Sequence, residues 1–133
     1  MSYEFIALTA ANEPDPHVAI SRVLKAIDGV SAVSSTVGDP PHVWASVEVA
    51  RPAAHDSVLI EMHSANDQTL LHEVDRLSSL GSAPDLAWVR GLWIFTLAGN
   101  ADVALAQAVV RVLSARQRTQ LYDERSGFEL RIN

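Results

Sequence analysis

The chain has 133 residues, with a hydrophobic fraction of 48% and a charged fraction of 20%, which are the values of a soluble globular protein. It contains no cysteine, which excludes disulfides, thiolate metal sites and a thiol nucleophile. The formal net charge is −6: residues 1–85 carry twelve acidic and four basic side chains, whereas residues 86–133 carry four and six. Such a charge is enough simply to keep a protein soluble. An acidic field also repels the phosphates of nucleic acid and attracts a basic protein, so we expect a protein partner and no nucleic acid.

The length predicts a single domain over residues 1–133, large enough to bury a core without disulfides or a metal. No apolar run approaches the length of a membrane-spanning helix. The first residues lack the basic region of a signal peptide and lead directly into a strand pattern. We therefore expect a cytoplasmic protein without a membrane partner.

The first two predicted elements are a strand and a helix. Tyr3–Thr9 is apolar on both parities, which is typical of a buried strand. Asp15 followed by Pro16 predicts a helix start, because the carboxylate can cap a free N–H and proline needs no donor at the first position. Gly29 is expected to end this helix. Its apolar residues recur at helical spacing and are Ile20, Val23, Leu24 and Ile27.

Two further strands are predicted next. Residues Val30–Val37 could begin a strand, but the Gly38–Pro41 loop interrupts it. His42–Ala50 and Ser57–His63 both alternate between apolar and other residues, and the connection between them is short enough for a hairpin. We therefore expect these two strands to pair in an antiparallel arrangement.

A second helix and a strand with two apolar faces follow. Asn66 or Asp67 is expected to cap the helix and Gly81 to end it. Leu86–Leu97 is apolar on both parities and contains Trp88 and Trp93. A strand of this kind needs cover on both faces, so we expect it to lie between two layers of structure with both tryptophans in the core.

This order, β-α-β-β-α-β, predicts an α+β protein with a ferredoxin-like core. A third helix is expected over Val103–Arg116, packed on the sheet face that such a core otherwise leaves open. Gln120–Ile132 alternates around Gly127 and predicts a C-terminal β-hairpin. The predicted architecture is therefore a ferredoxin-like core extended by a third helix and a C-terminal hairpin.

No pattern in the sequence predicts catalysis. His72-Glu73 begins like the zinc-binding His-Glu-x-x-His motif, but Arg76 stands where the second histidine is required. There is no Gly-x-Ser-x-Gly nucleophile motif and no glycine pattern that would hold a phosphate. We therefore expect a protein that is not an enzyme and has no catalytic residue, no cofactor and no bound metal.

One group of residues does predict a binding surface. On paired strands, residues of one parity share a face, so Trp44, Glu48, Glu61 and His63 are expected to lie together, next to Asp39 in the preceding loop. An exposed tryptophan among acidic residues suits the centre of a protein interface. Two alternatives stay open: the third helix covers Trp44, or the Glu48–Glu61–His63 face lines the cavity of a small enzyme or ligand-sensing domain.

The segment from Leu121 to Phe128, with its Leu-Tyr-Asp-x-x-Ser-Gly pattern after an alanine-rich helix, resembles the ending of several small bacterial α/β families. Some of these families are immunity proteins of polymorphic toxin systems. The resemblance covers about the last quarter of the chain and transfers no functional residue. It implies an acidic cytoplasmic protein that neutralises a cognate toxin by occluding its active site. Combined with the charge pattern, it leads us to expect a basic toxin domain as the partner. The sequence leaves both a monomer and a homodimer open.

Overall fold

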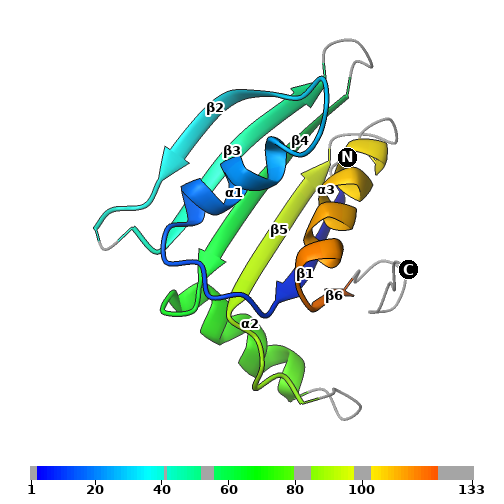
Figure 1. The fold of residues 1–133 in the computed structure, drawn as a ribbon. Coiled ribbons are helices and arrows are strands. Elements are labelled where there is room, and N and C mark those ends of the chain that lie inside the picture. Colours follow the sequence, from blue (N-terminus) through cyan, green and yellow to red (C-terminus); the bar gives the residue numbers. More distant parts are fainter. Residues whose placement is uncertain (1–2, 41, 52–55, 80–84, 98–102, 123–133) are drawn as a thin grey trace.

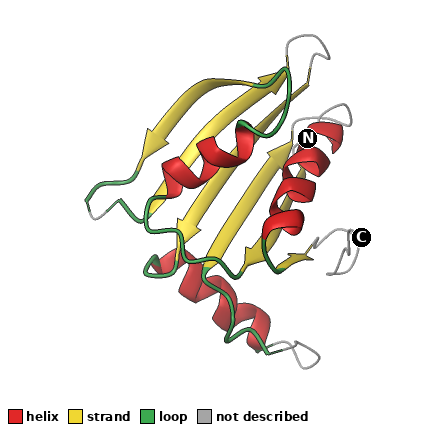
Figure 2. Ribbon diagram, viewed as in Figure 1, coloured by secondary structure: helices red, strands yellow, loops and turns green. Residues whose placement is uncertain are grey.

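The computed structural model of the chain describes residues 3–40, 42–51, 56–79, 85–97 and 103–122. Over these residues the chain forms a six-stranded sheet and three helices (Figure 1, Figure 2). In chain order the elements are β1 (Tyr3–Thr9), α1 (Pro16–Leu24), β2 (Ser31–Val37), β3 (Trp44–Arg51), β4 (Asp56–Ser64), α2 (Gln68–Ser78), β5 (Gly91–Leu97), α3 (Val103–Arg116) and β6 (Thr119–Tyr122).

The strands are arranged in the order β2-β3-β4-β5-β1-β6, and each neighbouring pair is antiparallel. The predicted α+β class is confirmed, but the ferredoxin-like strand order is not. In that order the strands called β1 and β4 here would be parallel neighbours. Instead β5 lies between them and runs antiparallel to both. The interrupted segment before Gly38 also forms a strand, β2, which adds one edge to the sheet.

The strand with two apolar faces lies between β4 and β1, whereas the predicted ferredoxin-like order would place it at an edge of the sheet. It begins at Gly91 rather than Leu86, and Leu92, Trp93 and Phe95 are all buried. Trp93 is therefore in the core as predicted, but Trp88 precedes the strand and is only half-buried, so the prediction for Trp88 is wrong. Phe95 stacks on Phe5 of β1, with ring centroids 4.9 Å apart. Because β5 buries large side chains on both sides, the most stable position for it is between two other strands and between two layers.

The helices begin where the capping residues predict. Oδ1 of Asp15 accepts the backbone N–H of Val18 at the start of α1, and Asp67 caps α2. The first helix is shorter than predicted: it ends at Leu24, and beyond it the N–H groups of Ala26 and Ile27 bond to the carbonyls three residues back, as in a tighter turn, before the chain reaches Gly29. The third helix has the predicted bounds. The predicted end of α2 at Gly81 and the hairpin beyond residue 122 lie outside the described residues.

Helices α1 and α3 cover one face of the sheet, and α2 packs on the opposite face (Figure 1). The larger core joins the apolar sides of α1 and α3 to side chains of β3, β4 and β5, among them Val47, Ile60 and Phe95. The prediction that the third helix covers the otherwise open face is therefore wrong. In α3, Ala106 and Val110 are buried in addition to the main apolar stripe. This helix therefore packs both on the sheet and beside α1.

On the opposite face, α2 covers one end of the sheet only. Leu70 and Leu77 of α2 pack with Leu8 and Leu92 in a second, smaller core. In the described part of the chain, the strand residues beyond this end are exposed or half-buried. We call this uncovered surface the open face; its residues are Ser34, Thr36, Trp44, Ser46, Glu48, Leu59, Glu61, Ile94 and Thr96.

Candidate functional site

The strand register places the predicted site residues on one side of the sheet. Trp44 lies opposite His63, and Glu48 lies opposite Leu59 on the same pair of strands. Glu61 precedes His63 by two residues on β4 and therefore shares its face. These four residues from β3 and β4 share one face of the sheet, as their spacing predicts, and α3 does not cover them because it packs on the other face.

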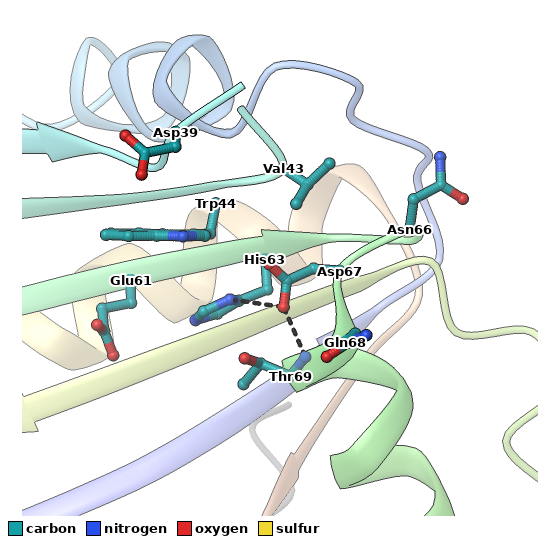
Figure 3. Close-up of a pocket in the computed structure, with 9 residues that line it drawn as sticks. All are labelled: Asp39, Val43, Trp44, Glu61, His63, Asn66, Asp67, Gln68 and Thr69. Carbon is teal, nitrogen blue, oxygen red and sulfur yellow. Dashed lines mark hydrogen bonds and ion pairs between the residues drawn. The ribbon is translucent and has the colours of Figure 1, made fainter. Parts of the chain in front are cut away.

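A pocket of about 600 Å3 opens at the α2 end of this surface. Its walls come from three parts of the chain: the loop before β3, the adjacent strands β3 and β4, and the first turn of α2 (Figure 3). The lining residues are Asp39, Val43, Trp44, Glu61, His63, Asn66, Asp67, Gln68 and Thr69. The lining therefore contains three carboxylates and no lysine or arginine, so its local charge is negative.

Trp44 forms one wall of the pocket and is half-buried, which agrees with its predicted partial exposure. Its indole lies against the ring of His63, with centroids 6.3 Å apart and an angle of 28° between the planes. On the loop side the indole lies against the backbone of Gly38, where a Cβ atom would come within 2.6 Å of Cε2. Only glycine leaves room for the ring in this position, so Gly38 helps to fix where the indole stands.

His63 lies at the centre of the lining residues, between Trp44 and the first turn of α2 (Figure 3). Its side chain is 8% exposed, and its Nδ1 atom is 3.2 Å from Oδ1 of Asp67, whose side chain is 6% exposed. This distance is that of an ion pair, but within the described chain neither ring nitrogen has a partner with hydrogen-bond alignment. The same Asp67 oxygen accepts the backbone N–H of Thr69 at 2.6 Å.

Glu48 stands apart from this pocket, although it is on the same face. It is exposed, and Ser34 of the edge strand donates a long hydrogen bond of 3.4 Å to its Oε2. Asp39 does line the pocket, from the loop between β2 and β3. Of the predicted binding residues, Trp44, Glu61, His63 and Asp39 therefore share one pocket, and only Glu48 does not.

Sequence reasoning treated Asp67 as a helix cap and did not assign it to the site. The i, i+4 spacing of His63 and Asp67 across a strand-to-helix turn is the signal that could have linked them, since such a turn folds the chain back on itself. Asn66, Gln68 and Thr69 line the pocket for the same reason. They belong to the turn that brings α2 under the sheet, which a sequence pattern does not place in space.

Two further observations bear on what the described residues can do. They contain no group of three or more histidine, aspartate or glutamate side chains arranged to hold a metal ion. None of the helices described is both long enough and apolar enough to span a membrane.

No family model, curated protein or solved structure matches the chain. Its function therefore has to be inferred from the open face and its pocket.

Proposed function

We propose that the protein is a non-enzymatic binding module, most concretely an immunity protein that neutralises a cognate bacterial toxin by direct contact. The observation that carries this proposal is the open face. It combines a half-buried Trp44 and an exposed Leu59 with the carboxylates of Glu48 and Glu61. Among the described strand residues of this face there is no lysine or arginine. A surface of this kind is complementary to a basic protein surface that also presents apolar side chains.

The residues of the open face suit different parts of an interface. Trp44 is the anchor, because tryptophan side chains supply much of the binding free energy where they become desolvated at the centre of a contact. The exposed carboxylate of Glu48 suits the rim, where charges guide a basic partner toward the surface and suppress wrong partners. Glu61 stands between these two regions, opposite Ser46 on the neighbouring strand.

The experiment is neutralisation of a toxin domain encoded beside this gene, measured by growth on co-expression and by calorimetry with the purified pair. We expect rescue of growth and a complex that Trp44→Ala and Glu61→Lys each weaken. The matched control is Asp28→Lys, which reverses an exposed charge just beyond α1 on the other side of the sheet and should leave affinity unchanged. No neutralisation and no complex, or equal losses in the control, would count against the proposal.

A second candidate is a small enzyme or ligand-sensing domain that acts through Glu61 and His63. The pocket favours it, since a carboxylate beside an imidazole is a common acid–base pair and both residues line one cavity. In this second candidate function Glu48 has no role, because it lies outside the pocket. This candidate predicts that Glu61→Gln abolishes turnover or ligand binding without changing the unfolding midpoint. The immunity proposal predicts that the same variant still neutralises the toxin, with reduced affinity.

A further inference from the structure

We propose that the pocket beside Trp44 binds the guanidinium group of an arginine side chain of the partner protein. This inference rests on the proposed function and makes its contact chemistry specific. The first argument is charge: Asp39, Glu61 and Asp67 line the pocket and no basic side chain does. Asp67 is already engaged by Thr69 and His63, so Asp39 and Glu61 are the two carboxylates whose charge would attract a cation.

The second argument is the indole of Trp44. A tryptophan ring attracts a cation placed over its face, and a guanidinium, which is planar, also stacks on it. The chain already contains one such pair: the guanidinium carbon of Arg118 lies 4.0 Å from the ring centroid of Trp88. In contrast to Trp88, Trp44 faces a pocket whose lining includes no arginine.

The third argument is independent of charge and concerns His63. Its side chain is more than nine-tenths buried and lines the pocket; Nδ1 lies 3.2 Å from Oδ1 of Asp67, and Nε2 has no hydrogen-bond partner within the described chain. A buried polar atom without a partner is costly, and a neutral imidazole has one nitrogen that can accept a hydrogen bond. A donor entering the pocket would supply what this ring lacks.

Arginine fits these requirements better than lysine. Its guanidinium carries five N–H donors in one plane, so it can bond to Glu61 and the ring of His63 while its face rests on Trp44. Asp39 lies on the other side of the indole and adds negative charge to the pocket (Figure 3). An ammonium group is a compact point charge with three donors and no face to stack. We therefore expect the pocket to discriminate between the two basic side chains.

The test is an NMR titration of the intact protein with N-acetyl-arginine amide at constant ionic strength, following the three indole N–H signals. Trp44→Phe identifies its own signal. We expect the Trp44 signal to shift progressively while those of Trp88 and Trp93 do not. N-acetyl-citrulline amide, which has nearly the same shape without the charge, should cause no shift. Glu61→Gln should weaken arginine binding about fivefold or more and Asp39→Asn to a smaller extent, and the control Asp28→Asn should not.

The same titration with N-acetyl-lysine amide tests the preference for arginine. Three results would overturn this inference: no selective shift of Trp44, binding of the citrulline or lysine compound as strong as that of the arginine compound, or unchanged affinity in Glu61→Gln. The proposed function fails separately. If a toxin encoded beside this gene is neutralised but the arginine compound does not bind, the immunity role stands and the guanidinium site is wrong. If the compound binds selectively and no toxin is neutralised, the site stands and the immunity role falls.

Discussion

Oδ1 of Asp67 lies 2.6 Å from the backbone nitrogen of Thr69 and 3.2 Å from Nδ1 of His63, so one buried carboxylate joins the start of α2 to the end of β4. Helix α2 is thereby attached to the sheet at the base of the pocket. Stability and binding are consequently coupled in this corner of the molecule, and substitutions there need controls that separate the two.

Replacing Asp67 with alanine should destabilise the protein by about 2 kcal/mol, because the part-buried N–H of Thr69 in the first helical turn loses its acceptor and the buried carboxylate no longer contacts His63. Asp67→Asn keeps an acceptor oxygen and should cost about half as much or less. Urea unfolding measures both. Asp15→Ala removes the exposed cap of α1, where the hydrogen bond is 3.2 Å long, and should cost about 0.5–1 kcal/mol. If the two alanine variants lose the same free energy of unfolding, burial of the Asp67 cap does not increase its contribution to stability.

Gly38→Ala should displace the indole of Trp44, because the added methyl group would overlap that ring. The expected loss of stability is about 1–3 kcal/mol, and the indole N–H signal of Trp44 should shift in the free protein. Gly29→Ala is the matched control. Gly29 has a φ of 74° with open space around it, so the substitution adds about 1 kcal/mol of backbone strain and should leave Trp44 where it is. An unchanged Trp44 signal in Gly38→Ala would contradict the close contact.

Most of the local structure could be predicted from the sequence, because it depends on neighbours in the chain. Asp15 and Pro16 mark the start of a helix by their own chemistry, and the two-sided apolar pattern of β5 requires cover on both of its faces. The strand order could not be predicted in the same way. The pattern shows that both faces of β5 need cover and does not show which strands lie beside it; the choice of β4 and β1 depends on contacts that are distant in sequence.

The candidate site was predictable to the extent that it lies on paired strands. Trp44, Glu61 and His63 share a face because the side-chain period of a strand is two, which the sequence displays directly. Asp67 was missed as a site residue since its position depends on how α2 turns under the sheet. Glu48 was grouped too closely with the others, because parity gives the face of a residue and not its distance along the strand.

Leu92→Ala and Ile94→Ala should differ clearly in cost, although the two residues are on the same strand and the same face. Leu92 is 1% exposed beneath α2, whereas Ile94 is half-buried at the boundary of the open face. We expect losses of about 3 kcal/mol for Leu92→Ala and about 1–2 kcal/mol for Ile94→Ala in chemical unfolding. Equal losses would mean that the open face is covered in solution, by a second copy or by another part of the chain; sedimentation distinguishes these two cases.

Glu48 and Trp44 should influence binding of the toxin partner through different rate constants. Glu48 is exposed and outside the pocket, so its charge acts mainly while the partner approaches. Glu48→Gln should slow association about two- to threefold at low salt, and this difference should shrink as salt screens the field. Trp44→Ala should leave association nearly unchanged and speed dissociation about 30-fold, the effect of losing about 2 kcal/mol from a desolvated anchor.

Surface plasmon resonance at several salt concentrations separates these two effects. Val18→Ala is a suitable control for Trp44→Ala, because it truncates an exposed apolar side chain on α1, across the sheet from the open face. Asp28→Asn is the control for Glu48→Gln, since it removes one exposed negative charge beyond α1 and tests whether net charge alone slows association. If Asp28→Asn slows association as much as Glu48→Gln, the acidity of the whole protein attracts the partner and the open face has no privileged role. If Trp44→Ala leaves dissociation unchanged, the partner binds elsewhere, because a buried indole cannot be removed from the centre of a contact without loss.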